Sequence, residues 1–409
     1  MKCFPILLLL FLFVKNGFSQ INSLYSSYGL GVVDVRDYNM FTGMGGVGIA
    51  LRSDRTISDL NPASFAGLDK DRLMMEIAFT GVTMNYVSSS QNVQGSDLAL
   101  KRAVFGMNLF KNVGTVIGLK RYSTVSYKSV VQKDVEGGNT SLTDYISGTG
   151  GINMFYLGNG FQLGKNLSLG VTGGFMFGSV NQKDAIVAPG GSTTYFENND
   201  FLNKAYWNTG FQYRFQSGKT NITLGATIQP EVHLNRIRDF YIKDASENIL
   251  LSDEDLDTEP FHFPLQWGGG FSIVRNRSTL SFDVIGQQWA GTGYRGSGFT
   301  SQDLRNYALG YKFTRQKKTW YGTADGLSLM VGLQYDNGYL KIQGHSVPAQ
   351  FVSLGFSQPS FKSGTMFSGA LRVGHRGLIA DPLVKEKFVD FTFNVGLFTL
   401  MNKSKYIYD

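Results

Sequence analysis

The side chains that could carry out catalysis are few and scattered along the chain. The histidines are His233, His262, His345 and His375. None of them belongs to an H-E-x-x-H or Cys/His metal pattern. A hydrolase could pair His262 with Asp257 or Glu259, or His375 with Ser368, but no G-x-S-x-G nucleophile motif accompanies them. The sequence therefore predicts no enzyme, no catalytic residue and no cofactor.

One acidic run has the spacing of a cation-binding loop. Asp253, Asp255 and Asp257 follow a D-x-D-x-D pattern, but a calcium loop also needs Gly at 258 and Glu at 264. Those positions hold Thr258 and Pro264. We therefore predict a hydrated acidic loop and no metal site, and a loose divalent bridge to lipid phosphates stays open as an alternative.

A glycine motif near the start has the G-x-G-x-x-G spacing of dinucleotide binding, in Gly43, Gly45 and Gly48. That fingerprint requires a strand before it and a helix after it. Arg52-Ser53-Asp54 would break such a helix at once. We predict that these glycines serve close packing, because small residues let a segment lie against a wall.

The first residues indicate export. Lys2 is followed by the apolar block 4–14 and then by the small residues Gly17 and Ser19, which is the order of a secretory signal peptide. We expect residues 1–19 to be cleaved, so that the mature chain begins at Gln20.

The composition favours a large β protein. Glycine makes up 50 of 409 residues, about 12% against roughly 7% on average, and aromatic residues make up 14%. Charged residues make up only 17%. After the signal peptide no apolar run reaches the roughly 18 residues of a membrane helix. The net charge of +7 is too mild and scattered to indicate nucleic-acid binding.

Two-residue alternation dominates after residue 71. In residues 389–397, large apolar side chains alternate with Asp390, Thr392, Asn394 and Gly396. We expect strands at 72–87, 98–111, 113–129, 144–163, 166–181, 201–216, 219–232, 263–275, 277–290, 303–314, 325–336, 347–357, 364–376 and 386–400. Short turns alternate with long loops such as 130–143, 182–200 and 233–262, and only Arg315 to Ala324 breaks this rule. This sorting is typical of outer-membrane barrels.

The sequence thus predicts an all-β, 14-stranded antiparallel transmembrane barrel over 72–400, with a periplasmic tail at 401–409. Residues 20–71 lack a long alternating run, so we expect them to form a hatch inside the lumen. The residues expected to shape it are Gly43, Gly45, Gly46, Gly48, Asn61, Pro62 and Ala63, with Gly45 and Gly46 against the wall. The residues expected to face the lumen are Tyr206, Asn208, Gln212 and Arg214.

The glycine-rich segment Gly43 to Ala50, followed by Asp59-Leu60-Asn61-Pro62-Ala63, resembles the hatch of the FadL-type family of outer-membrane transporters. Phe263-Pro264-Leu265 and the segment Leu280 to Trp289 are also similar to that family. The resemblance implies fourteen strands, a plugged lumen and passive transport of hydrophobic compounds such as long-chain fatty acids across the outer membrane of a Gram-negative cell.

Two functions follow. In the first, the barrel passes a hydrophobic small molecule along a hatch-gated route. In the alternative, it is a structural or accessory subunit of a secretion or barrel-assembly complex with a permanently closed lumen. The expected partners are outer-membrane lipid and lipopolysaccharide, with a hydrophobic ligand or detergent-like lipid in the lumen or protein partners in a complex. An apolar open lumen would favour transport, and a lumen filled by the hatch would favour the scaffold.

Overall fold

The structure is a computed structural model that describes residues 23–87, 92–134, 141–296, 298–319, 322–360, 364–379 and 383–400. The predicted signal peptide and the predicted tail at 401–409 lie outside these ranges. Within them, no helix has the length and apolar character needed to cross a membrane.

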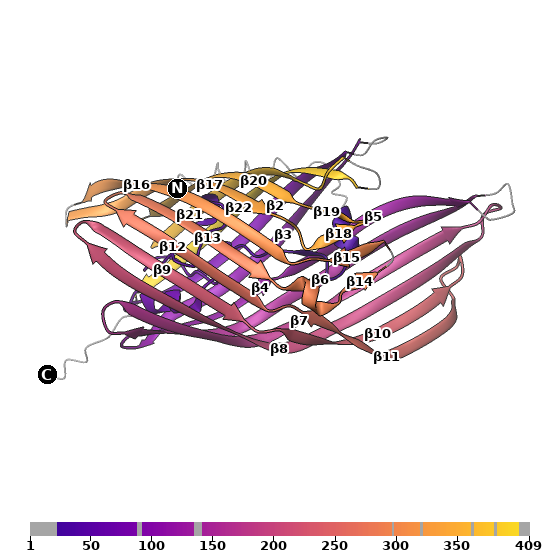
Figure 1. Cartoon of the computed structure of the whole chain (residues 1–409), viewed down its shortest axis with the longest axis horizontal. Coiled ribbons are helices and arrows are strands. Elements are labelled where there is room, and N and C mark those ends of the chain that lie inside the picture. Colours follow the sequence, from indigo (N-terminus) through magenta and orange to yellow (C-terminus); the bar gives the residue numbers. More distant parts are fainter. Residues whose placement is uncertain are drawn as a thin grey trace.

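The described chain folds into one closed antiparallel barrel (Figure 1). Its wall segments are β2 (Arg72–Val87), β3 (Asn92–Phe110), β4 (Val113–Arg121), β5 (Ser123–Asp134), β6 (Ser141–Leu163), β7 (Leu167–Val187), β8 (Thr193–Ser217), β9 (Thr220–Gln229), β10 (Val232–Lys243), β11 (Ile249–Phe263), β12 (Gln266–Arg275), β13 (Ser278–Gln287), β16 (Leu304–Thr319), β17 (Gly322–Asp336), β20 (Ala349–Ser360), β21 (Thr365–Arg376) and β22 (Lys385–Leu400). The barrel closes where β2 pairs with β22 along its whole length.

The predicted count of fourteen strands is confirmed. Three wall strands are each built from two consecutive segments, β4 with β5, β9 with β10, and β11 with β12. The second and third of these are interrupted at Pro230 and Pro264. Proline removes a backbone donor, so an interruption of the ladder at these residues is expected.

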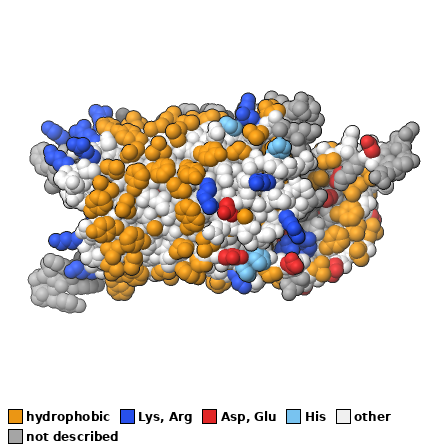
Figure 2. Space-filling view, in the orientation of Figure 1, with side chains coloured by type: hydrophobic (Ala, Val, Ile, Leu, Met, Phe, Trp, Pro, Cys, Tyr) orange, Lys and Arg blue, Asp and Glu red, His pale blue; other side chains and the backbone are white. Residues whose placement is uncertain are grey.

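Successive side chains of the wall strands point alternately outward and inward, so the two faces of the wall differ in composition. Leu169, Val171 and Phe175 of β7 point outward and are exposed, whereas Ser168 and Thr172 point inward and are buried. Figure 2 shows the outward apolar side chains as a broad belt over one part of the barrel, with Lys and Arg gathered at the end on the left. An apolar belt of this kind is what a lipid-facing wall requires.

The wall reaches further than the sequence predicts. The segments 130–143, 182–200 and 233–262 were expected to be loops, but β5 to β8, β10 and β11 continue through much of them. They form a sheet that projects beyond the rest of the barrel, on the right of Figure 1. The exceptional loop Arg315 to Ala324 is also mostly strand, because β16 and β17 stay paired as far as Thr319 and Gly322. These extensions are polar, so the sequence shows no apolar alternation there, although the backbone hydrogen bonds between the strands continue.

Two of the predicted outer loops contain short structure of their own. Residues 291–302 and 337–346 contribute β14 (Arg295–Gly296), β15 (Phe299–Ser301), β18 (Leu340–Ile342) and β19 (His345–Ser346), which form a small four-stranded sheet. The short 3-10 helix η4 (Trp289–Thr292) precedes them.

The N-terminal segment lies inside the barrel, as predicted. It contains the 3-10 helices η1 (Leu24–Ser27), η2 (Thr42–Met44) and η3 (Pro62–Gly67), and the two-residue strand β1 (Val32–Val33), which pairs with β5. Its side chains, such as Ile57 and Phe65, form one hydrophobic cluster with inward residues of the wall. The core of this barrel is therefore the boundary between the hatch and the wall.

Candidate functional site: the hatch and the lumen wall

A row of glycines on the wall receives η3 of the hatch. Gly114, Gly160, Gly170 and Gly210 stand directly opposite one another on β4, β6, β7 and β8. A Cβ atom on Gly170 would lie 2.2 Å from the carbonyl carbon of Pro62, and one on Gly114 would lie 1.8 Å from the carbonyl oxygen of Phe65. The backbones approach too closely for any side chain, so this row forms a seat for η3.

Asn61 links this seat to the rest of the hatch. Its side chain is fully buried, and Nδ2 donates to the carbonyl oxygens of Ile49 at 2.8 Å and of Phe211 on the wall at 3.0 Å. Its Oδ1 accepts from the Ala63 N–H at 3.0 Å, so Asn61 caps η3, and Pro62 occupies the first position of that helix. The Asn-Pro-Ala sequence therefore begins η3 and holds it against β8.

The glycine segment 43–48 packs on the opposite part of the wall. A Cβ on Gly43 would lie 2.6 Å from Cα of Gly355, and one on Gly45 would lie 2.7 Å from the carbonyl oxygen of Leu333. The hydroxyl of Ser353 donates to the Gly43 carbonyl and accepts from the Gly45 N–H, both at 3.0 Å. Gly45 has a φ of +73°, which glycine adopts readily.

Two members of this segment behave differently from their neighbours. We expected Gly46 to lie against the wall, but the atoms nearest to its position belong to Arg36 of the hatch. Gly48 and Ile49 donate their N–H groups to the same oxygen of Asp283 on β13, at 2.6 and 2.8 Å. A pair of N–H groups that could bind an anion is thus occupied by a carboxylate of the wall, which fits a packing role for the G-x-G-x-x-G spacing.

A buried cluster of charges joins the hatch to β2 and β3. The guanidinium of Arg102, only 1% exposed, lies 2.5 Å from Asp37 and 3.2 Å from Asp59 of the hatch, and it also binds Glu76 of β2. Both of its terminal nitrogens donate to the carbonyl oxygen of Ile57 at 3.0 Å. Three carboxylates therefore share one cation, which is strongly bound on both sides of the boundary.

A second charged group lies nearer the start of the hatch. Arg36 forms two hydrogen bonds to Asp34, at 3.0 and 3.1 Å, and donates to the hydroxyl of Tyr38 at 2.7 Å. Burial alone would raise the pKa of Asp34, but the Arg36 guanidinium holds that pKa well below its usual range. Asn394 of β22 donates to the carbonyl oxygen of Tyr38 at 2.9 Å, so this group is also attached to the wall.

The first described residues are anchored to the start of β22. Glu386 is completely buried and accepts from the hydroxyl of Ser23 at 2.8 Å and from the N–H of Leu24 at 2.8 Å. Tyr25 donates to the carbonyl oxygen of Val384 at 2.6 Å. Together with Asn61, Asp283 and Arg102, these contacts attach the hatch to the wall around the circumference.

The residues predicted to face the lumen lie on one face of β8. Gln212 is buried and donates to the carbonyl oxygens of Ile49 and Leu51 at 2.9 and 3.2 Å. Tyr206 and Asn208 line a cavity beside the hatch. Arg214 has the same orientation along the strand but is exposed.

The sequence did not reveal Glu76, Arg102, Asp283, Ser353 and Glu386 as hatch contacts. In the sequence each of them is a charged or hydroxyl side chain at an inward position of a strand. A residue that faces water in an open lumen has the same appearance.

Small cavities remain between the hatch and the wall. Three cavities there measure about 80, 50 and 40 Å³. Pockets that hold a drug-sized ligand usually measure about 300–1,000 Å³. The largest of the three is lined by Asp34, Arg36, Lys101, Arg372 and Asp390 among others. A cavity of this size and charge suits a few water molecules better than a hydrophobic compound.

Comparison with known proteins assigns the family. A family model described as BamG matches residues 1–404. The chain belongs to the BamG family. No protein with a curated function is significantly similar to this BamG-family chain in sequence.

Solved structures confirm that its fold is similar to FadL-type barrels. The Pseudomonas putida toluene transporter TodX has a TM-score of 0.62 at 13% identity, with 90% of this chain and 99% of TodX covered. A Pseudomonas aeruginosa FadL homologue has a TM-score of 0.59 at 12% identity, covering 90% and 98%. The CymD monoaromatic hydrocarbon channel has a TM-score of 0.58 at 15% identity, covering 91% and 99%. At these identities the likeness of this BamG-family chain to them concerns the fold alone, which is that of outer-membrane channels.

The four histidines lie on four different strands, β10, β11, β19 and β21. His375 and Ser368, which were considered together as a candidate pair, both lie on β21 seven positions apart, which is about 23 Å along a strand. His345 lies in β19. His233 and His262, in contrast, stand directly opposite each other on β10 and β11.

Proposed function

We propose that this BamG-family barrel is a structural, accessory subunit of an outer-membrane assembly complex, and that its lumen stays closed. The observation that carries the proposal is the hatch, which fills the lumen and is bonded to the wall around its circumference. The family name supports it, because it follows the naming of the β-barrel assembly machinery (BAM). A subunit of that kind needs a stable outer surface and has no need of an open lumen.

Transport of hydrophobic molecules receives less support from the same site. A hydrophobic ligand would have to pass the buried charges around Arg102 and Arg36, and an apolar molecule that separates these charges leaves them buried without their partners. The similar proteins include a toluene transporter and a monoaromatic hydrocarbon channel. Their identity to this chain is at most 15%, so the cargo does not carry over.

The projecting sheet offers a surface for a protein partner. At the tip of the β10–β11 hairpin, Ile249, Leu250 and Leu251 are consecutive and each more than half exposed. Figure 2 shows apolar side chains at this end, separated from the main belt by charged residues. An apolar patch outside the lipid belt is typical of a protein–protein contact. We therefore expect this tip to contact another subunit.

Native purification of the tagged, full-length protein from its own membranes tests the proposal. We expect the central barrel of the assembly machinery to co-purify in a fixed ratio, as determined by native mass spectrometry. Leu250→Asp should lower that ratio, whereas Ser192→Asp, a control at the tip of the neighbouring β7–β8 hairpin, should leave it unchanged. A monomer carrying a stoichiometric hydrophobic molecule in its lumen would refute the scaffold role.

A further inference from the structure

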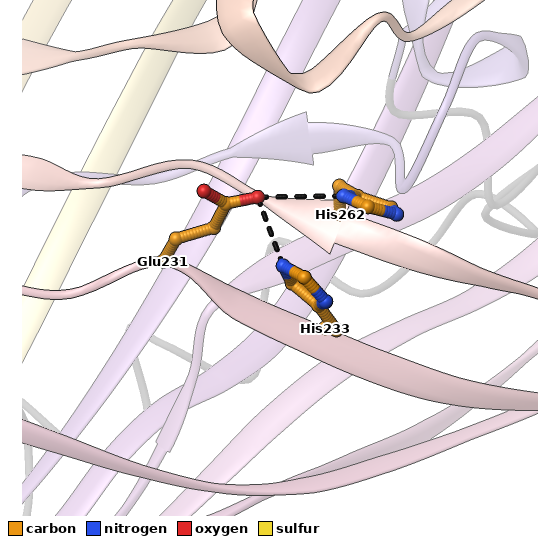
Figure 3. A group of neighbouring side chains, drawn as sticks. All are labelled: Glu231, His233 and His262. Carbon is orange, nitrogen blue, oxygen red and sulfur yellow. Dashed lines mark hydrogen bonds and ion pairs between the residues drawn. The ribbon is translucent and has the colours of Figure 1, made fainter.

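Three side chains on the outer surface form a compact group of nitrogen and oxygen atoms. His233 of β10 and His262 of β11 are cross-strand partners, and Glu231 immediately precedes β10. Figure 3 shows both imidazoles directed toward one carboxylate oxygen. The Glu231 Oε1 atom lies 3.0 Å from Nε2 of His233 and 3.3 Å from Nδ1 of His262. The two rings are 4.2 Å apart.

These distances are close to the spacing of ligands around a tetrahedral metal ion. Zinc binds His nitrogen and carboxylate oxygen at roughly 2.0–2.2 Å, which places neighbouring ligand atoms about 3.3–3.6 Å apart in a tetrahedron. In the structure one ligand atom of each residue lies within 4.8 Å of the others. Small side-chain rotations would therefore bring all three into a single coordination sphere, with the cation replacing the protons that the imidazoles now direct at Oε1.

The backbone beneath the group is held in place. Val232, Leu234, Phe261 and Phe263 alternate with the two histidines and are buried on the lumen side. Val232 pairs with Phe263 and Leu234 with Phe261, so the register of the two strands is fixed on both sides of the histidine pair. The three ligating side chains are partly exposed, which leaves them accessible to an ion from solution.

We propose that Glu231, His233 and His262 form a binding site for one divalent transition-metal ion of the zinc type. Two imidazoles select such an ion over magnesium or calcium, which prefer oxygen ligands. Three protein ligands leave the fourth position to water on the outer face. The spacing of residues 231, 233 and 262 gave no sign of this site, because pairing of β10 with β11 creates it.

The position of the site indicates what the ion does. The group lies where β9 gives way to β10 and β11 gives way to β12, beside Pro230 and Pro264. The ladder is interrupted there, at the base of the projecting sheet. An ion bound to both strands ties β10 to β11 at this point. This structural role is independent of the proposed function in the assembly complex.

Zinc titration of the purified full-length barrel in detergent, after chelator treatment, tests the site. We expect one Zn²⁺ per chain by calorimetry, and Co²⁺ in its place should give the visible absorption of a tetrahedral site. His233→Ala and His262→Ala should each weaken binding by at least about tenfold, because loss of even an outer-shell partner costs 10–100-fold. The double variant His345→Ala/His375→Ala is the control and should bind as the wild type does.

Hydrogen exchange tests the structural role with a second readout. Zn²⁺ should slow amide exchange in β10 and β11 of the wild type and have no effect in His262→Ala. Absence of stoichiometric binding, or equal binding after both His233 and His262 are replaced, would overturn the site. Binding without any change in exchange would overturn the role of the ion in tying the two strands.

Discussion

The seat of η3 allows a sharp test of how the hatch is held. Gly170→Ala adds one methyl group on the lumen face of β7, 2.2 Å from the carbonyl carbon and 2.4 Å from the carbonyl oxygen of Pro62 and 2.3 Å from the Ala63 nitrogen. All three are backbone atoms, so no flexible side chain can move aside. Asn61 binds the backbone of β8 and holds this segment close to the wall. The added methyl group can therefore fit only if η3 moves away from the wall.

The size of the effect follows from the crowding. Overpacking a well-packed interior costs about 1–3 kcal/mol, and three backbone contacts at such distances favour the upper half of that range. A cost of about 2–3 kcal/mol, at 1.4 kcal/mol for each factor of ten, raises the population in which η3 is detached by about 25- to 150-fold.

Amide hydrogen exchange of residues 61–68 measures this population in the folded barrel. The control is Gly173→Ala on the same strand, where a Cβ would meet no atom within 4 Å. We expect faster exchange of η3 in Gly170→Ala and unchanged exchange in Gly173→Ala, while both barrels remain heat-modifiable on gels. Equal exchange in the two variants would refute the seat.

Three further predictions concern the charges and the outer face. Arg102→Met leaves buried carboxylates without their cation and should lower the free energy of unfolding, measured by thermal unfolding, by about 3–5 kcal/mol. Lys111→Met in an exposed turn should lower it little. Equal losses in the two variants would contradict the role of the cluster. Asp283→Ala leaves two hatch N–H groups without an acceptor and should cost about 1–3 kcal/mol, with Asp283→Asn milder; protease cleavage of the hatch reports both, and resistance like that of the wild type would count against this contact. Phe175→Arg should lower stability in lipid by about 2–4 kcal/mol if Phe175 lies near the bilayer midplane. Tyr145→Arg, about 33 Å further out on the adjacent strand, should be nearly neutral. Similar losses in the two variants would show that the lipid-facing belt is assigned to the wrong part of the wall.

The wall could be predicted from the sequence where lipid imposes a pattern. Lipid requires apolar side chains on the outward face, so strands such as β7 and β22 show strict alternation in the sequence. Beyond the belt both faces meet water. Residues 239–243 pair with residues 195–199 of β8 in unbroken register, although they show no apolar period. Backbone pairing alone leaves no mark in a sequence, so side-chain alternation predicts loops where the projecting sheet lies.

The site could be predicted only in outline for a related reason. Asn61, Pro62 and the glycines of 43–48 signal a tightly packed turn, and glycines such as Gly170 and Gly210 alternate with the large residues of their strands. That four of them form one row depends on strand register, which the sequence does not state. The partnership of Arg102 with Asp37 and Asp59, and that of His233 with His262, depends on the fold in the same way.

The distribution of contacts bears on whether the lumen ever opens. A gate that opens easily swings on one side and is held by a few contacts on the other. Here wall residues on β3, β8, β13, β20 and β22 bond to several parts of the hatch, through Arg102, Gln212, Asp283, Ser353 and Glu386. A small local shift breaks one of these contacts and leaves the others in place, so a passage requires several to break together, including separation of Arg102 from two carboxylates. Because these polar wall groups all bind the hatch, they favour a plug that remains in place. The outer surface is then the part of the molecule that can respond to a partner.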